Sequence, residues 1–563
     1  MEKRVLIAAL LSFAVLYAFQ VMFPTAAPDA QKPAQASKAA TAPNASAPAT
    51  ANPTPAPQGA PSPAPEIAAR EIVFESADVR AVFTTRGAVV KSWRLKKYRD
   101  DHGQPYDLVA GHAPADSALP FTLAVDDPSL SAVLAAAPFN VTETPSNGWQ
   151  AQFDYEGNGI RAQKTFSVAP DKPYLINVTA SVTRDGTSVP VTIKWGPALG
   201  SGMTVKGRTY NPPAQPIFFK DTKVTRVAAA KIPEQAVQEG ALGFAGVDDH
   251  YFLTAIVKPA QPLRIDYAPV DVTLPDHPEG AHYVSWSARF PAPPASAAFF
   301  AGPKDFDVLA HVDRDLVRAI DFGMFAWLVV PLLRALKWIN GYVGNYGWSL
   351  VLLTVLINLA MFPLRHKSVV SMRRMQEMQP EMKAIQDRYK HLKMSDPARA
   401  KMNQEIMSLY KERGVNPASG CVPMLLTLPV LFAFYAMLSV AIELRGAPFI
   451  FQITDLSAHD PWFIWPALMG ITMFVQQKMA PSTADPAQQR IMVIVMPIML
   501  TAFMAWSASG LVIYWTVSNV WGIAQQMITN RLIGPAVVRT VRPPAERRVK
   551  SVGGGKTDQA KER

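Results

Sequence analysis

The distribution of apolar residues in the last two-fifths of the chain predicts a bundle of membrane helices. Five apolar segments follow one another, at 346–364, 421–442, 461–477, 491–506 and 511–530. A helix needs about 20 apolar residues to cross the hydrocarbon core of a bilayer. The third and fourth segments have only 17 and 16 residues, so they must thin the bilayer or expose their ends. We therefore expect a five-helix transmembrane bundle that disturbs the membrane around it.

A sixth apolar run lies near the N-terminus, where residues 5–23 follow Lys3 and Arg4. The run is longer than the core of a cleaved signal peptide, which has about 7–15 residues. We expect residues 1–23 to form an uncleaved signal-anchor helix, with a cleaved signal as the alternative. Residues 24–65 are rich in Ala, Pro, Ser and Thr. Such a segment cannot bury enough apolar surface to fold, which predicts a disordered linker.

After the linker, polar and apolar residues alternate as they do in strands. Examples are Glu71-Ile-Val-Phe-Glu75 and Tyr174-Leu-Ile-Asn-Val178, and glycine-containing turn signals separate such runs. Residues 66–305 are therefore predicted to form a β-sandwich domain. Between residues 313 and 341, apolar residues recur every three to four positions. That spacing predicts an amphipathic helix, which we place in the outer membrane interface.

The positive charge of the chain is concentrated beside the apolar segments. The net charge is +11; residues 365–413 contain 12 basic and 6 acidic residues, and residues 531–563 contain 9 and 3. Positive loops favour the cytoplasm, so we predict a cytoplasmic helical hairpin at 365–413 and a basic cytoplasmic tail at 531–563. Six crossings then leave both termini in the cytoplasm and residues 24–345 outside. Charge beside membrane spans favours anionic phospholipid over nucleic acid as its partner.

The motifs of common catalytic sites are not found in the sequence. There is no HExxH, no glycine–lysine phosphate loop and no GxSxG. We predict that the protein is not an enzyme and has no catalytic residues, cofactor or metal. Asp248-Asp249-His250 could ligate a metal, but we interpret it as a polar cluster in a loop or at a strand end. A sugar-processing enzyme built on the β-domain remains an alternative, because sequence cannot place two carboxylates together.

Polar residues within the apolar segments indicate a hydrophilic groove. Thr354 and Asn358 lie four apart on one helix face, and Gln476 and Gln477 end the segment 461–477. The last segment carries a polar stripe at helical spacing, formed by Trp515, Ser518 and Asn519, Gly522, and Gln525 and Gln526. The predicted groove residues are Thr354, Asn358, Gln476, Trp515, Ser518 and Asn519. Unpaired polar groups are costly in hydrocarbon, so they must face each other or a wet cavity. Interhelical hydrogen bonding is the alternative interpretation. A small-solute transporter is the main alternative function, but the spans contain no acidic residue suited to proton coupling.

A methionine stripe at helical spacing marks the predicted hairpin. Its members are Met372, Met375, Met378 and Met382, and Arg373 and Arg374 lie among them. Methionine side chains adapt to varied apolar partners, so the stripe and the two arginines could contact a client polypeptide or a ribosome. Packing between the two helices of the hairpin is the alternative.

A series of short motifs runs in order through about 200 residues of the C-terminal part. They are Tyr346-Gly-Trp-Ser349, Met361-Phe-Pro-Leu364, Val415-Asn-Pro417, Gly420-Cys-Val-Pro423, Glu443-Leu-Arg-Gly-Ala-Pro-Phe449, Asp455-Leu-Ser457, Asp460-Pro461, Gln477-Lys-Met-Ala-Pro481, Asp485-Pro486, Met496-Pro497, Ser509-Gly-Leu-Val-Ile-Tyr514 and Ser518-Asn519. With these motifs, the chain resembles the YidC/Oxa/Alb family of membrane protein insertases. The long outer β-domain is similar to that of the Gram-negative bacterial members.

The resemblance implies a multi-domain protein of the bacterial inner membrane, with residues 24–345 in the periplasm and the β-sandwich at 66–305 among them. It implies that nascent membrane proteins are inserted and folded through the groove, alone or with the Sec translocon and its accessory subunits. Ribosomes or signal-recognition machinery are the expected partners of the hairpin and the tail. Anionic phospholipid is the expected lipid partner.

One position departs from the family pattern. Members usually carry Arg or Lys in the groove, six residues before the leucine of the Pro-Leu pair, and here that position is Asn358. Arg365 follows seven residues later, about 10 Å further along a helix. We interpret Arg365 as an anchor at the membrane interface rather than as a substitute cation.

Overall fold

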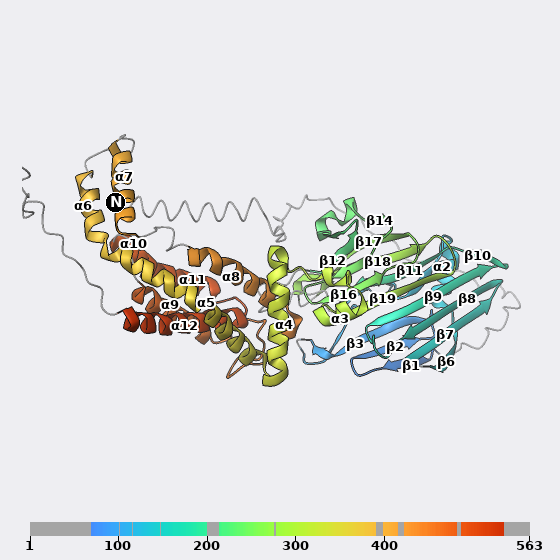
Figure 1. The fold of residues 1–563 in the computed structure, drawn as a ribbon. Coiled ribbons are helices and arrows are strands. Elements are labelled where there is room, and N and C mark those ends of the chain that lie inside the picture. The colour runs from blue at the N-terminus through green and yellow to red at the C-terminus, as the bar shows by residue number, and fades with distance from the viewer. Residues whose placement is uncertain are drawn as a thin grey trace, which may run out of the picture. The chain divides into compact units, whose positions relative to one another are not determined.

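The computed structural model describes residues 69–100, 102–114, 116–146, 148–199, 213–274, 277–389, 398–414, 422–480 and 486–533. The chain divides into a β-rich unit that ends at Ala319 and a helical unit that begins at Ile320 (Figure 1). The predicted anchor 1–23, the linker 24–65 and nearly all of the tail 531–563 lie outside the described residues.

The β-rich unit contains three antiparallel sheets (Figure 1). The first is formed by β1 (Glu71–Glu75), β2 (Val79–Thr84), β3 (Val89–Arg99) and β4 (Pro105–Asp107). The long sheet has the order β13 (Lys223–Arg226), β12 (Gln215–Lys220), β15 (Phe244–Asp248), β16 (Phe252–Val257), β19 (Ala295–Pro303), β9 (Leu175–Arg184), β8 (Ile160–Val168), β7 (Gly148–Gly157) and β6 (Asn140–Ser146), with β10 (Thr187–Val189) paired to β9. The third has the order β14 (Val237–Gly240), β17 (Leu263–Leu274), β18 (His277–Phe290), β11 (Val191–Ala198) and β5 (Thr122–Ala124).

Alternation along the strands builds the core of this unit. In β8, buried residues alternate with more exposed ones along the strand, as expected for a sheet with one covered face. Phe166 of β8 contacts Phe83 of the first sheet, at 5.1 Å between ring centroids, and also Phe121. Phe299 of β19 contacts Trp286 of the third sheet at 6.0 Å. One face of the long sheet thus packs against both smaller sheets, in agreement with the predicted β-sandwich.

The predicted helix 313–341 is wrong in its first part. After α3 (Phe306–Val312), Asp313 is extended, and the short turns η2 (Leu316–Ala319) and η3 (Gly323–Phe325) follow. The α-helix α4 covers only Ala326–Val343. Gly323 has a φ of +64°, which an α-helix does not tolerate, although the apolar spacing continues across it. The compact β-rich unit accordingly extends beyond the predicted end at 305, to Ala319. It also contains α2 (Pro128–Ala136) and η1 (Ala229–Glu234).

The helical unit contains a helix at each predicted apolar segment. The helices are α5 (Tyr346–Glu377), α6 (Gln379–Arg388), α7 (Ala398–Glu412), α8 (Val422–Val440), α9 (Ile464–Met479), α10 (Pro486–Arg490), a π-helical turn (Ile491–Val495), α11 (Met496–Met504) and α12 (Ser509–Ile533), with a turn η5 (Ile442–Leu444) after α8. In Figure 1, α12 runs beside both α5 and α9, and α11 lies against α9. The predicted hairpin corresponds to the pair α6 and α7.

The predicted end of the first bundle helix at Leu364 is wrong, because α5 continues through Pro363 to Glu377. A proline inside a helix removes one hydrogen bond and favours a kink. Two contacts with α12 hold the helix on either side of this proline. Gln525 Nε2 donates to the Phe362 carbonyl at 3.2 Å, and His366 Nδ1 lies 3.1 Å from Thr529 Oγ1.

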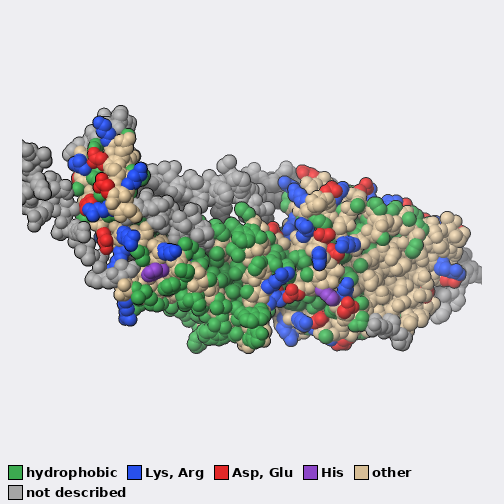
Figure 2. Space-filling model, viewed as in Figure 1, with side chains coloured by type: hydrophobic (Ala, Val, Ile, Leu, Met, Phe, Trp, Pro, Cys, Tyr) green, Lys and Arg blue, Asp and Glu red, His purple; other side chains and the backbone are tan. Residues whose placement is uncertain are grey.

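The outer surface of the bundle is apolar. Phe503 is 71% exposed, Ile498 66% and Ile471 60%. Figure 2 shows hydrophobic side chains over the visible face of the bundle and charged side chains on the end formed by α6 and α7. Of the described helices, α5 alone is long and apolar enough to cross a membrane, and Leu428–Val440 and Gln488–Met504 are shorter apolar helices. An apolar surface of this extent indicates contact with a membrane or a partner.

The helix α4 has two different apolar faces. Leu332, Leu333 and Leu336 are buried, whereas Trp338 and Tyr342 are exposed. Lys337 Nζ lies 3.0 Å from Glu443 Oε1 in η5, which ties α4 to the end of α8. Exposed Trp and Tyr are typical of the interface between membrane and water. This arrangement is compatible with the predicted interfacial position of α4.

Candidate functional site

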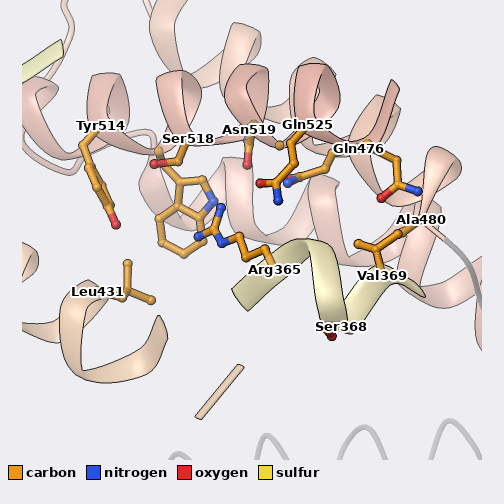
Figure 3. A pocket seen from close by; sticks show the side chains of 13 residues that line it. Arg365, Ser368, Val369, Leu431, Gln476, Ala480, Tyr514, Ser518, Asn519 and Gln525 are labelled. Atoms are coloured by element: carbon orange, nitrogen blue, oxygen red, sulfur yellow. The ribbon is translucent and has the colours of Figure 1, made fainter. Parts of the chain in front are cut away.

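A cavity of about 330 Å³ lies within the helical unit, between α5, α8, α9 and α12. Its lining residues are Arg365, Ser368, Val369, Leu431, Gln476, Ala480, Tyr514, Trp515, Ser518, Asn519, Gly522, Gln525 and Gln526. Most of the polar groups come from one face of α12, because the spacing of three to four residues aligns them. Figure 3 shows Ser518, Asn519 and Gln525 on α12 and Arg365 on α5 facing the same space.

Four of the six predicted groove residues line this cavity: Gln476, Trp515, Ser518 and Asn519. The other two, Thr354 and Asn358, are buried beside it and are not among its lining residues. The hydroxyl of Thr354 is directed to the backbone of α5 rather than to the cavity. Its Oγ1 donates to the Leu350 carbonyl at 2.7 Å, so its hydroxyl is satisfied by its own helix. Serine and threonine commonly make this bond to the carbonyl four residues earlier.

Asn358 connects α5 to α12 and to Arg365. Its Nδ2 donates to the Thr354 carbonyl at 2.8 Å and lies 3.4 Å from Ser518 Oγ. Its Oδ1 accepts a hydrogen bond from Arg365 Nη1 at 2.8 Å. Both functions of the amide are therefore used, and the amide orientation is fixed by these neighbours.

The interpretation of Arg365 as an interfacial anchor is wrong. Its side chain turns back along α5 to Asn358 and lines the cavity. Helical side chains tilt toward the N-terminus of their helix, so a long side chain at position i+7 can approach position i. The pair Asn358 and Arg365 therefore acts at one place in the groove, although the two residues are seven apart in the sequence.

Other amides both line the cavity and join helices. Asn519 Nδ2 lies 3.3 Å from the Met469 carbonyl and 3.2 Å from Thr472 Oγ1, both on α9. The wet-groove and interhelical-bond interpretations are therefore not exclusive, because Asn519 serves as a link while it lines the cavity. Gly522 makes room for another amide: a Cβ at this glycine would lie 2.1 Å from Gln476 Nε2.

Several lining residues were not in the predicted site. Arg365, Ser368, Tyr514, Gln525 and Gln526 join it. Gln525 and Gln526 belong to the polar stripe predicted on the last segment, although they were not among the six predicted groove residues. The only feature of the sequence that could have placed Arg365 in the site is its spacing of two helical turns from Asn358. The direction of its side chain depends on tertiary contacts.

The predicted methionine stripe is divided between two helices. Met372 and Met375 belong to α5, whereas Met382 belongs to α6, so the stripe does not lie on one helix as predicted. Met378 is buried between them, and Met382 Sδ accepts from Tyr410 Oη of α7 at 3.2 Å. Packing within the hairpin therefore accounts for Met382.

The basic residues of the stripe differ in environment. Arg374 is exposed, whereas Arg373 is half-buried and its Nη1 has no hydrogen-bond partner among the described residues. The pairs Arg388–Glu405, at 2.8 Å, and Arg413–Glu381, at 2.5 Å, hold α6 and α7 together. The predicted contacts of this hairpin with a client or a ribosome stay predictions.

Asp248 and Asp249 in the β-rich unit accept hydrogen bonds from protein groups rather than pointing toward a common metal site. Asp248 is fully buried, and its Oδ2 accepts from Arg226 at 3.0 Å and from Lys304 Nζ at 3.0 Å. Asp249 Oδ1 accepts from the backbone N–H groups of Tyr251 and Phe252. Among the described residues no group of three His, Cys, Asp or Glu side chains could hold a metal ion.

The β-rich unit also contains a buried cation. Lys164 is fully buried in β8, and its Nζ donates to the carbonyls of Gly87 at 3.0 Å, Ala88 at 2.6 Å and Phe121 at 2.7 Å. Burial lowers the pKa of Lys164 to about 7. The three carbonyls oppose this shift, because they can satisfy all three donors of the ammonium group. This lysine joins β8 to two other segments of the unit, at residues 87–88 and at Phe121.

Two family descriptions match consecutive parts of the chain. The family described as the YidC periplasmic domain matches residues 71–335, and the family described as 60Kd inner membrane protein matches residues 338–535. The boundary between the two matches falls inside α4.

Similar proteins match nearly the whole chain. The membrane protein insertase YidC of Geobacter metallireducens is 35% identical over 547 residues, covering 95% of this chain and 99% of its own. The insertase of the same name from Anaeromyxobacter dehalogenans is 36% identical, covering 94% and 96%. These relatives are insertases, so they give the small-solute transporter no support.

A solved structure described as an active YidC insertase with its first transmembrane domain resolved is 17% identical and covers 81% of this chain and 91% of its own. Its TM-score of 0.33 is too low to support an argument about fold. The family follows instead from the sequence relatives and from the two family descriptions. The chain belongs to the YidC family of membrane protein insertases.

Proposed function

We propose that the protein inserts nascent membrane proteins into the inner membrane, and that the cavity between α5, α8, α9 and α12 is the site where a client passes. The observation that carries this proposal is the contrast between the two sides of the bundle helices. Amides, hydroxyls and one guanidinium line the cavity, while large apolar side chains cover the outer surface. The names of the relatives support the same function.

The physical task is to move a polar flank of the client through hydrocarbon. An unpaired amide or hydroxyl in an apolar medium costs on the order of 2–7 kcal/mol. Ser518, Gln476 and Gln525 offer hydrogen bonds within the bundle, so a polar flank could exchange water for these groups. The apolar segment of the client then enters lipid, favoured by about 25 cal/mol per Å² of apolar surface removed from water. No covalent step is needed, so we propose that the protein is not an enzyme.

The short apolar helices support a locally thinned membrane. The helix Gln488–Met504 and the 16 residues of α9 are shorter than a full crossing. We propose that the five bundle helices, together with the N-terminal anchor 1–23, cross the membrane six times. The hairpin, the tail and both termini then lie in the cytoplasm, and residues 24–345 lie in the periplasm. A thinned bilayer shortens the apolar path of the client.

The proposed partners follow from the distribution of charge and from the family. The basic hairpin and tail would meet anionic phospholipid, and ribosomes or signal-recognition machinery, on the cytoplasmic side. The Sec translocon and its accessory subunits are proposed as partners for clients that need both systems.

A photocrosslinking amino acid at position 515 or 518 tests the proposed site. During insertion of a single-span client in native membranes, we expect crosslinks from both positions, because both residues line the cavity. The matched control is position 356 on α5, where Leu356 is 51% exposed and does not line the cavity. Capture of the client at 356 with none at 515 and 518 would refute the groove as the path.

A further inference from the structure

The loop that joins α8 to α9, at residues 441–463, has an inverted distribution of polar and apolar side chains. None of its ionisable residues is exposed; they are Glu443, Arg445, Asp455, His459 and Asp460. Its exposed residues are Gly446, Pro448, Phe451, Thr454, Pro461, Trp462 and Phe463, and only Thr454 among them has a polar side chain. A loop in water has the opposite arrangement, because water solvates charge well and aromatic surface poorly. The arrangement indicates apolar surroundings for this loop.

The acidic residues of the loop are paired within the helical unit. Asp460 is 1% exposed, and its Oδ1 accepts from the Trp462 N–H and from Gln452 Nε2, each at 3.1 Å. Its Oδ2 accepts from the Trp465 N–H at 2.8 Å. Glu443 forms an ion pair with Lys337 of α4 at 3.0 Å. These contacts keep the negative charges of the loop away from its outer surface.

Strained backbone positions turn two aromatic rings of the loop outward. Phe451 and Phe463 have φ values of +51° and +56°, in the left-handed region that bulky residues rarely adopt. Phe451 is 89% exposed and lies in a turn closed by the Phe449 N–H, which donates to the Ile453 carbonyl at 3.0 Å. Phe463 is also exposed. Such strain costs about 1–3 kcal/mol per residue and often marks a functional position.

The loop is fixed to the ends of the bundle helices. The N–H groups of Ser509 and Gly510, at the start of α12, donate to the carbonyls of Ala458 and Leu456 at 2.7 and 2.9 Å. At Gly347 of α5, a Cβ would lie only 2.1 Å from Cδ2 of Phe449 in the loop. The outward aromatic rings are therefore a fixed part of the surface of the bundle.

The exposed rings continue the apolar outer surface of the bundle. From the end of the loop, Ile464, Leu468 and Ile471 are exposed along α9 at helical spacing. Phe463 contacts Trp506, which follows α11, at 6.1 Å between ring centroids. Aromatic rings at the end of a lipid-facing surface are typical of the boundary between headgroups and acyl chains.

The β-rich unit has a different kind of surface. Within its described part, the exposed large apolar side chains are Val73, Leu119, Val133 and Val237, and none of them is aromatic. Isolated exposed apolar residues of this kind are normal on a soluble surface. A lipid boundary matches the rings of the loop better than this surface does.

We infer that the α8–α9 loop is a membrane-binding site, at which Phe451, Trp462 and Phe463 enter the boundary between headgroups and acyl chains. The leaflet is the one at this end of the bundle, which is the periplasmic leaflet in the proposed topology. The inference rests on the proposed function for that side and adds a lipid contact that fixes the depth of the bundle. Because the loop exposes no cation, the contact requires no anionic lipid.

The test measures the surroundings of single positions in the full chain, reconstituted in phosphatidylcholine vesicles. In a Cys421→Ser background, which removes the one cysteine of the sequence, Phe451→Cys or Trp462→Cys receives a nitroxide label. Collisions of the label with oxygen, which concentrates in lipid, are compared with collisions with a nickel chelate, which stays in water. We expect the oxygen-to-nickel ratio at both positions to be several-fold higher than at a water-exposed control. Both side chains are exposed, so neither substitution removes a packed group.

The matched control is Asn158→Cys, in the turn between β7 and β8. Asn158 is exposed and has a φ of +53°, so it shares the backbone conformation of Phe451. Its label should collide mainly with the nickel chelate. Adding phosphatidylglycerol to the vesicles should leave the ratios at positions 451 and 462 unchanged.

Two results would overturn the inference. Ratios at 451 and 462 equal to that at 158 would show that the loop lies in water. Low collision rates with both reagents would show that protein covers the rings, either the β-rich unit of the same chain or a second copy.

Insertion of a single-span client by the unlabelled protein, in the same vesicles, separates this inference from the proposed function. If the client is inserted while the labels report water, the proposed function stands and the inference is wrong. If the labels report lipid while no client is inserted, the membrane-binding site stands and the proposed function fails.

Discussion

Each of the two units contains a cation away from its charged surface: Lys164 is fully buried, and Arg365 is half-buried beside a cavity. In the β-rich unit, Lys164 donates to three backbone carbonyls, which is the full capacity of an ammonium group. In the helical unit, Arg365 donates one hydrogen bond within the described chain and faces a cavity. A saturated cation surrounded by packed side chains stabilises a fold. An unsaturated cation beside open space retains the capacity to bind.

The packing around the two cations also differs: it is close around Lys164 and open beside Arg365. Lys164 lies in a core where Phe139 and Phe166 are within 6 Å of its Nζ. Arg365 lies between helices joined by a few amide hydrogen bonds, such as the pair Gln525–Phe362. Close packing leaves no space for a ligand, whereas the bundle leaves a cavity of about 330 Å³. This contrast can be tested by removing or titrating each cation.

The largest effect is expected from Lys164→Met. The substitution preserves much of the side-chain volume but leaves three buried carbonyls without their donor. We expect the free energy of unfolding of the β-rich unit to fall by about 3 kcal/mol, since each unsatisfied buried group costs about 1–3 kcal/mol and the loss of a buried charge offsets part of this. Urea titration with pulse proteolysis of the outer unit would measure it. An unchanged urea midpoint for Lys164→Met would show that Lys164 does not stabilise the β-rich unit, which contradicts the comparison between the two cations.

A second effect concerns pH. The pKa of Lys164 is lowered by burial from 10.5 to about 7. Between these values the unfolded chain binds a proton that the folded chain has released, so stability rises with pH by up to about 1.4 kcal/mol per unit above pH 7. Below pH 7 both states are protonated, and this contribution is constant.

The measurement for this effect is the same urea titration at pH 6, 7, 8 and 9, with Lys164→Met as the control that removes the titrating group. We expect the unaltered protein to gain stability relative to the variant as pH rises above 7. Parallel curves across the whole range would show that the three carbonyls keep the ammonium charged to high pH.

The smallest effect on stability is expected from Arg365→Gln. The variant loses one hydrogen bond to Asn358 and removes a half-buried charge, so the free energy of unfolding of the bundle in detergent should change by less than about 1 kcal/mol. Thermal unfolding followed by size-exclusion chromatography would measure it. A loss as large as that expected for Lys164→Met would make Arg365 a structural cation like Lys164 and sharply weaken the comparison.

Local pattern in the sequence determined much of the fold and part of the site. The alternation of apolar residues identified the β-sandwich, because half-covered strands have a period of two. The five apolar segments each contain a helix in the structure. Within the last segment, helical spacing placed Trp515, Ser518 and Asn519 on one face, and all three line the cavity.

Tertiary contacts decided the rest. The break between α3 and α4 depends on the backbone conformation at Gly323. The helix α5 continues through Pro363 because α12 contacts it on both sides, through Gln525 at the Phe362 carbonyl and Thr529 at His366. The Thr354 hydroxyl donates to the Leu350 carbonyl of its own helix, and the Arg365 guanidinium donates to Asn358 Oδ1 in the groove. Periodicity specifies which face of a helix a residue occupies. The direction of a long side chain, and the partner that satisfies it, depend on neighbours that are brought together only by the fold.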